Sequence, residues 1–176
     1  YLSAVLFPRL VSLLQAQGPG IRLDLQTPSD LALSLLEQGE IDVLLVPKDH
    51  CLRDHPAELL FEERYVVAGW AGNPLLSNPL TEDDFYAARH VAVTIGASVE
   101  ERTSFSEDQL KARGRERQIE VMAYSFTQVP ALLIDTQRLT LMQERLARTL
   151  ATTLPIAWQP LPFDFPVMHE MIQYHR

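Results

Sequence analysis

The segment SDLALSLLEQGEIDVLLV, from Ser29 to Val46, carries the strongest structural signal in the chain. Ser29 or Asp30 offers a side-chain oxygen to the first free backbone amides of a helix, and Gly39 supplies the permissive backbone at which that helix ends. Five of the six residues from Ile41 to Val46 are apolar, as expected of a strand covered on both faces. The segment therefore predicts half of a parallel βαβ unit, in which ligands bind where strands end and helices begin.

The composition indicates a globular protein that buries a core. The chain has 176 residues, of which 47% are hydrophobic, so we expect one domain or two small lobes. No apolar run approaches the roughly 20 residues that cross a bilayer, and no signal-peptide pattern is visible in the given residues. Cys51 is the single cysteine, which excludes an internal disulfide and fits a reducing compartment. We therefore expect a cytoplasmic protein without membrane association.

The charge balance argues against nucleic acid as a direct partner of these residues. The net charge is −8, with 15 basic against 23 acidic residues, whereas phosphate recognition requires clustered Lys and Arg. The one basic cluster, at 111–117, follows an acidic helix and is expected to be a solvated helix end.

The expected elements describe two successive α/β units with a crossing strand between them. An amphipathic helix covers 2–17, and Pro8 places its start between Ser3 and Leu6 because proline fits only the first helical turn. Alternating residues at 21–25 predict a strand. We further expect a helix to begin at 81, helices at 98–113, 130–134 and 144–151, and strands at 59–61, 65–70, 90–96, 119–124, 139–142, 156–158 and 168–174.

Six stretches, taken in their order and spacing, resemble a known family. LFPRL (Leu6–Leu10), LLEQGEIDVLLVP (Leu35–Pro47) and LFEERYVVAGWAGNPL (Leu60–Leu75) resemble the effector-binding domain of LysR-type bacterial transcription regulators. HVAV (His90–Val93), RLTLMQERLA (Arg138–Ala147) and LPFDFPVMHEMIQYHR (Leu161–Arg176) are similar to the branch that regulates aromatic catabolism and nodulation genes. The resemblance covers essentially the whole chain.

This resemblance implies an α/β fold of two Rossmann-like lobes joined by crossing strands, like a type 2 periplasmic binding protein. Lobe I would comprise 1–67 and 157–176, and lobe II 68–156. The family's winged helix-turn-helix domain and first core strand would precede Tyr1, so the fold is expected to be trimmed at its N-terminus. DNA would then be contacted only through that absent domain. The resemblance also implies a homodimer, a tetramer at full length, and no cofactor.

By the same resemblance, a small effector lies in the cleft between the lobes. The positions that match the family's contacts are Tyr1, Ser3, Ser29, His90, Thr94, Ser98, Phe126 and Thr127. Free amides and hydroxyls at several helix starts would hold a carboxylate or phenolate oxygen. Phe126 and Tyr1 could sandwich an aromatic ring, and a histidine could read an acidic group near neutral pH. We therefore expect an aromatic or carboxylate effector.

Each of these residues also has a structural interpretation. Ser29, Ser98 and Thr127 fit plain helix caps, His90 fits a hydrogen-bonded histidine inside the fold, and Phe126 fits the core.

A metal site is not expected. His169 and His175 share a strand face but lack a third ligand. The cluster of His50, Cys51 and His55 lacks the spacing of a zinc site.

The sequence offers no anchor for catalysis. It contains no Gly-x-Ser-x-Gly, phosphate-binding glycine loop or His-Glu-x-x-His motif. Adjacent carboxylates such as Glu62 and Glu63 point to opposite faces of a strand, so we expect no catalytic residues and no enzyme.

Two alternatives to a regulator's sensory domain stay open: a solute-binding protein of a transport system, and a small-molecule enzyme on the same scaffold. An upstream signal peptide would favour the former, and turnover of an aromatic acid the latter.

Overall fold

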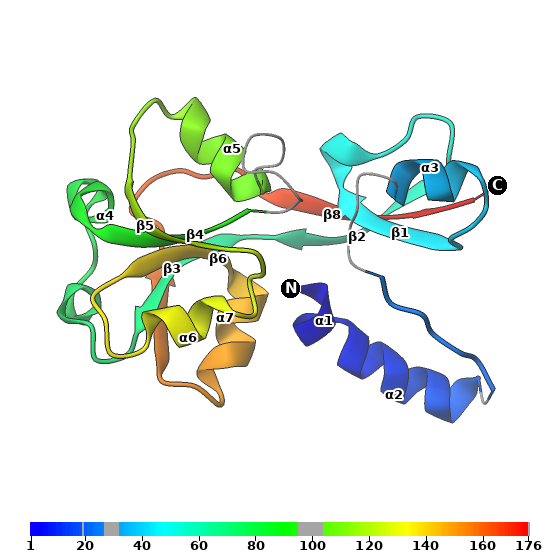
Figure 1. Ribbon diagram of the computed structural model, residues 1–176, viewed down its shortest axis with the longest axis horizontal. Helices are drawn as coiled ribbons and strands as arrows, with labels where there is room; N and C mark the ends of the chain where they lie inside the picture. The colour runs from blue at the N-terminus through cyan, green and yellow to red at the C-terminus, as the bar shows by residue number, and fades with distance from the viewer. Residues whose placement is uncertain (19, 27–31, 95–103, 176) are drawn as a thin grey trace.

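The computed structural model describes residues 1–18, 20–26, 32–94 and 104–175 and shows a mixed α/β protein with two sheets (Figure 1). The expected fold class, in which two sheets are joined by crossing strands, is confirmed. Nine helical segments lie in the described part of the chain: α1 (Leu2–Val5), α2 (Phe7–Gln17), α3 (Ala32–Glu37), η1 (Lys48–His50), η2 (Pro74–Ser77), α4 (Glu82–Ala87), α5 (Phe105–Ala112), α6 (Val129–Leu133) and α7 (Glu144–Ala151).

The smaller sheet has the strand order β1-β8-β2 and is antiparallel throughout. Its strands are β1 (Val43–Pro47), β2 (Ala57–Glu63) and β8 (Met168–Tyr174). Strand β8 is the middle strand and comes from the end of the chain, so the first and last parts of the chain build this sheet together (Figure 1).

The larger sheet has the order β5-β4-β6-β3-β7. Strand β4 (Arg89–Val93) is parallel to β5 (Gln118–Ala123) and β6 (Leu139–Gln143), as the second expected α/β unit requires. Strand β3 (Tyr65–Trp70) runs antiparallel to β6 and to β7 (Ile156–Pro160). Helices α6 and α7 lie together on one side of this sheet (Figure 1).

The segment from Ser29 to Val46 keeps its helix-glycine-strand order but not its parallel pairing. Gly39 has a φ of +70°, the left-handed conformation predicted for a helix end. Strand β1, however, pairs only with β8 among the described strands, and the pairing is antiparallel. Val43 is 48% exposed, because β1 is an edge strand and an apolar run does not specify which faces are covered. The expected parallel, fully covered strand is therefore wrong.

The N-terminal segment also departs from expectation. The helix expected over 2–17 is broken at Leu6, and Pro8 takes its favoured place in the first turn of α2. Residues 21–25 form no strand, and Ile21, Leu23 and Leu25 are 59%, 39% and 50% exposed. Alternation alone cannot make a strand, because a strand needs a neighbour to complete its hydrogen bonds, and no described strand pairs with this segment.

Two apolar clusters cover the two faces of the larger sheet. Val66 and Ala68 of β3 face one cluster with Phe126 and Leu146, while Tyr65 and Val67 face the other, as the two-residue period of a strand requires. Burying a side chain of this size stabilises the fold by about 1.5–3 kcal/mol. None of the described helices is long and apolar enough to cross a membrane.

Candidate binding site at the junction of the two sheets

Two buried carboxylates lie where the chain crosses between the sheets. Strand β2 ends at Glu63, and in its register with β8 Glu63 is opposite Met168 while Phe61 is opposite Glu170. Opposite residues of paired strands share a face, so Glu63 and Glu170 are diagonal neighbours on one face. Their exposed fractions are 1% and 2%. Carboxylates are rarely buried this deeply without a specific reason.

Glu170 is held by the first residue of the chain. The Tyr1 hydroxyl donates to Glu170 Oε2 at 2.9 Å. Burial raises the pKa of Glu170 to about 7; the hydrogen bond and the α-amino group of Tyr1 oppose this rise, and Glu63 adds to it. Burial and the Glu170 carboxylate in turn raise the pKa of the Tyr1 hydroxyl. The Glu170 carboxyl group therefore changes charge near neutral pH.

Glu63 connects β2 to helix α7. The backbone N–H of Arg145 donates to Glu63 Oε1 at 3.3 Å, and Arg145 Nε lies 3.4 Å from Glu63 Oε2. Arg145 also donates to the Glu62 carbonyl at 3.0 Å, and the Glu144 N–H donates to the Arg64 carbonyl at 2.8 Å. Glu63 thus occupies the anion position at the N-terminus of α7, which complements the helix dipole. Burial raises the pKa of Glu63, while the Arg145 amide and guanidinium oppose that rise.

Tyr65 and Gln143 complete the polar lining on the larger sheet. They are opposite each other on β3 and β6, and both are buried. The Tyr65 hydroxyl donates to Met168 Sδ at 3.5 Å, across the two sheets. Gln143 Oε1 is buried and accepts no hydrogen bond from the described part of the chain. We call these six residues (Tyr1, Glu63, Tyr65, Gln143, Arg145 and Glu170) the junction.

Two cavities open beside the junction. One of about 590 Å³ is lined by Glu62, Glu63, Arg64, Glu144, Arg145 and Arg148. The other, of about 330 Å³, has aromatic walls from Tyr65, Trp158, Phe163 and Phe165 and shares Arg64 and Glu144 with the first. Both volumes fall in the range of small-molecule sites. The second cavity has the more suitable lining for an aromatic compound, because rings and guanidinium groups pack on aromatic faces.

The structure brings three of the residues predicted for the site to one end of the larger sheet. The Tyr1 and Phe126 rings are in edge-to-face contact, with centroids 6.5 Å apart, so a ligand ring between them would require the two to separate. Phe126 is 6% exposed and belongs to an apolar cluster. Thr94 follows β4, is 6% exposed, and its N–H donates to the Ala123 carbonyl at 2.9 Å.

The structure does not bring His90 to this end. His90 is opposite Leu139 at the start of β6, whereas Gln143 ends β6 at the junction. His90 is fully buried, and its Nε2 lies 2.7 Å from the Phe85 carbonyl. Burial lowers the pKa of His90 to about 4, so this ring is neutral at neutral pH and does not respond there to an acidic ligand.

The remaining predicted residues are scattered or outside the described residues. Ser3 is exposed on α1. Thr127 is exposed and its hydroxyl lies 2.9 Å from that of Ser125. Ser29 and Ser98 lie outside the described ranges.

Sequence reasoning missed the carboxylates of the junction. Glu170 alternates with Met168 and Ile172 on β8, and a carboxylate in the apolar register of a strand is a signal that was available. Glu63 was considered only as half of an adjacent pair. The pair does point apart as expected, because the Glu62 side chain is 62% exposed and that of Glu63 is 1% exposed.

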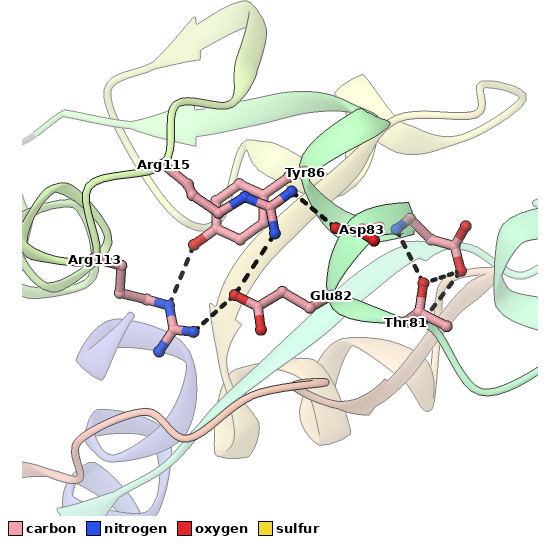
Figure 2. A network of polar contacts seen from close by, with 7 residues as sticks. Thr81, Glu82, Asp83, Tyr86, Arg113 and Arg115 are labelled. Atoms are coloured by element: carbon pink, nitrogen blue, oxygen red, sulfur yellow. Dashed lines mark hydrogen bonds and ion pairs between the residues drawn. The ribbon is translucent and has the colours of Figure 1, made fainter.

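The basic cluster at 111–117 belongs to a different network, at the end of α4. Arg113 donates to Glu82 at 2.8 Å and to the Tyr86 hydroxyl at 3.3 Å (Figure 2). Arg115 donates to Asp83 at 3.0 Å and lies over the Tyr86 ring at 4.2 Å. These arginines pair with acids of the chain itself and stay partly exposed, so they form a surface network.

Comparison with known proteins places these features in context. The profile of the LysR substrate binding domain family matches residues 1–176. Nodulation protein D 2 of Rhizobium tropici is 33% identical over 174 residues, which cover 99% of this chain and 54% of that protein. The chain therefore spans about half the length of the curated relatives it matches.

Solved structures with the same fold include two from Pseudomonas aeruginosa. A probable transcriptional regulator superimposes with a TM-score of 0.87 at 27% identity, covering 99% of this chain and 59% of that one. The regulatory domain of the transcriptional activator MexT gives a TM-score of 0.81 at 22% identity, covering 99% of this chain and 85% of that one. The latter likeness concerns the fold alone.

Proposed function

We propose that this chain, which belongs to the LysR substrate binding domain family, binds a small aromatic or carboxylate effector between its two sheets. The family and the nodulation relatives confirm the resemblance seen in the motifs. The chain is therefore the effector-binding domain of a LysR-type transcriptional regulator, with a type 2 periplasmic-binding-protein-like fold. The similar proteins include nodulation proteins and a probable transcriptional regulator, which supports a regulator's sensory domain over a transport protein or an enzyme.

The observation that carries the proposal is the junction itself. Buried polar groups from both sheets meet there, and Tyr65 and Met168 touch across it beside a cavity of about 330 Å³. A ligand that contacts both sheets would favour one of their arrangements over others, which is what a sensor requires. We propose that the two lobes correspond to the two sheets, with crossings at Arg64 and within 161–167, close to the expected boundaries after 67 and before 157.

We assign roles by position to the residues that the sequence predicts, none of which lines either of the two cavities. Tyr1, Ser3, Thr94, Phe126 and Thr127 are proposed to approach the effector from the larger sheet and α1. Ser29 and Ser98 are proposed as further contacts at the expected helix entrances. His90 is proposed to hold the α4–β4 turn through Phe85 rather than to contact the effector.

Thermal unfolding tests effector binding. Benzoate, salicylate, 4-hydroxybenzoate and 4-hydroxyacetophenone separate the carboxylate from the phenol. A compound present at about 100 times its Kd should stabilise the native state by about 2.7 kcal/mol. Thr94→Val should reduce the shift and Thr153→Val, an exposed site after α7, should preserve it. Absence of any shift across the panel contradicts the proposal, and turnover of a compound would favour an enzyme instead.

We also propose that two copies of this chain pair, and that DNA binding resides in the part of the whole protein outside this chain. The motivating surface is the apolar side of α2 with the adjacent extended segment. Val11 and Leu13 are 49% and 46% exposed, and Ile21 and Leu25 are at least half exposed. Exposed apolar surface of this kind marks an interaction site.

A further inference from the structure

We propose that protonation of Glu170 sets the arrangement of the two sheets, so that the junction is a proton-sensitive joint. The inference rests on the position of Glu170 and does not depend on the identity of the effector. Strand β8 is the middle strand of its sheet, with Pro47 on one side of Glu170 and Phe61 on the other. A side chain in this position is enclosed by its neighbours, and that of Glu170 is 2% exposed.

The groups that face Glu170 do not neutralise a negative charge well. From Tyr1, which precedes α1, come the hydroxyl, at 2.9 Å, and the backbone nitrogen, which is a charged amine only where the chain starts at this residue. From β2 comes Glu63, a second acid on the same face. The neutral hydroxyl of Tyr65 faces Glu170 from β3. The Cys51 thiol faces it from the segment after β1, and this thiol is itself near Asp49 and Lys48. Within the described ranges, no Lys, Arg or His side chain forms an ion pair with Glu170.

Glu63 differs from Glu170 in having a cation. Its carboxylate receives both the backbone N–H and the guanidinium of Arg145. Of the two diagonal carboxylates, Glu63 is therefore the one with a nearby compensating cation, and Glu170 is the one whose protonation we place at the joint.

The two charge states of Glu170 favour different arrangements of the junction. A neutral carboxyl group is buried at modest cost and keeps its hydrogen bond to Tyr1. An ionised Glu170 carboxylate loses its hydration and also lies beside the carboxylate of Glu63. Both effects oppose burial of the charge. Admitting water relieves both penalties, and separation of the sheets at the crossing would bring water to Glu170. The closed junction therefore belongs to the protonated state, and the pKa of about 7 places the change near neutral pH.

Small-angle scattering and thermal unfolding of the ligand-free chain test the inference. We expect the radius of gyration of the wild type to increase as pH rises, with a midpoint at about 7, and that of Glu170→Gln to stay at the low-pH value. Tyr1→Phe removes a hydrogen bond to the ionised form, so its midpoint should move to higher pH. Glu58→Gln, an exposed site on β2, is the matched control and should behave as wild type.

Thermal unfolding gives a second readout with a defined sign. The pKa of Glu170 is higher in the folded state than in the unfolded state. Its contribution to the free energy of unfolding is therefore fully present at low pH, and it is lost as the pH rises from the unfolded-state pKa towards 7. The Tm of Glu170→Gln minus that of wild type should grow by roughly 5 to 10 °C between about pH 4.5 and about pH 8. The opposite pH effect of His90 cancels in this difference.

Three results would overturn the inference. One is a wild-type radius of gyration that does not change with pH, whatever the stability does. Another is a Glu170→Gln variant whose radius of gyration and Tm change with pH in parallel with those of the wild type. If Glu170→Gln does not fold, an unmoved midpoint in Tyr1→Phe decides against the proposal.

Discussion

Glu63 shows how one residue joins the two halves of the molecule. It ends β2 in one sheet, yet its carboxylate binds the first turn of α7, which packs on the other sheet. Its side chain is 1% exposed, so its charge must be compensated locally. Arg145 provides this compensation and also covers the Phe61 ring at 4.7 Å. The crossing at Arg64 is thus held by contacts with both sheets.

Replacement of Glu63 tests this role. Glu63→Gln should destabilise the chain by about 1–2 kcal/mol, because the amide keeps at most one bond to α7 and loses the ion pair. The value lies below that of a fully buried pair, since the Arg145 side chain is 49% exposed and partly screened. Chemical denaturation provides the measurement. Glu62→Gln, the exposed neighbour, should change the stability little, and an equal loss in both variants would refute the assigned role.

At the scale of elements, α4 is a short helix that depends on its ends. The Thr81 hydroxyl accepts a hydrogen bond from the Asp84 N–H at 3.1 Å, and the Asp84 carboxylate accepts one from the Thr81 N–H at 3.1 Å. The sequence predicts that a helix begins at 81, and the structure shows that a capping box forms its start. Arg113 then ties α4 to the segment 161–167 by donating to the Asp164 carbonyl at 3.0 Å.

Loss of the cap should be measurable. Thr81→Ala removes the acceptor for the Asp84 N–H, and the Tm should fall by about 2–4 °C. Thr153→Ala is a suitable control, because its hydroxyl makes only a 3.5 Å bond in an exposed turn. If both variants have the same Tm as the wild type, the capping box does not stabilise α4.

The sequence predicts these elements better than it predicts how they pair. Capping residues, Gly39 and the prolines act through their immediate neighbours, so α2, α4 and the end of α3 follow from the sequence. The direction of β1 depends on β8, which lies more than 100 residues further on, and no local pattern encodes that choice. Residues 21–25 illustrate the same limit. Their apolar and polar residues alternate as in a strand, but no described strand pairs with them.

The candidate site was harder to predict for a related reason. Tyr1, Thr94 and Phe126 were named because the family places contacts at helix entrances and strand ends. Glu63 and Glu170 become neighbours only through the β2–β8 register, and burial, which gives Glu170 its pKa of about 7, is a property of the folded molecule.

At the scale of the whole molecule, α2 and the segment after it lie apart from the two sheets (Figure 1). Their exposed apolar side chains predict pairing with a second copy. Light scattering of the wild type should give twice the chain mass of 20.0 kDa, and Leu13→Glu should shift the population to monomers by placing a charge on that surface. A wild type that stays monomeric at high concentration would contradict this assignment.

The two-sheet arrangement also explains how a sensor can work on this scaffold. The sheets are joined at Arg64 and along 161–167, and within the described residues the junction adds contacts between them, such as the hydrogen bond from Tyr65 to Met168. A ligand acts only through a difference in its affinity for the two arrangements.

Small-angle scattering with and without ligand therefore tests the central claim most directly. The chain is measured at fixed pH alone and with whichever of benzoate, salicylate, 4-hydroxybenzoate or 4-hydroxyacetophenone raises its Tm. Binding between the sheets predicts a smaller radius of gyration with the compound, and a loss of that change in Thr94→Val. A compound that raises the Tm but leaves the radius of gyration unchanged would place its site elsewhere and contradict the account.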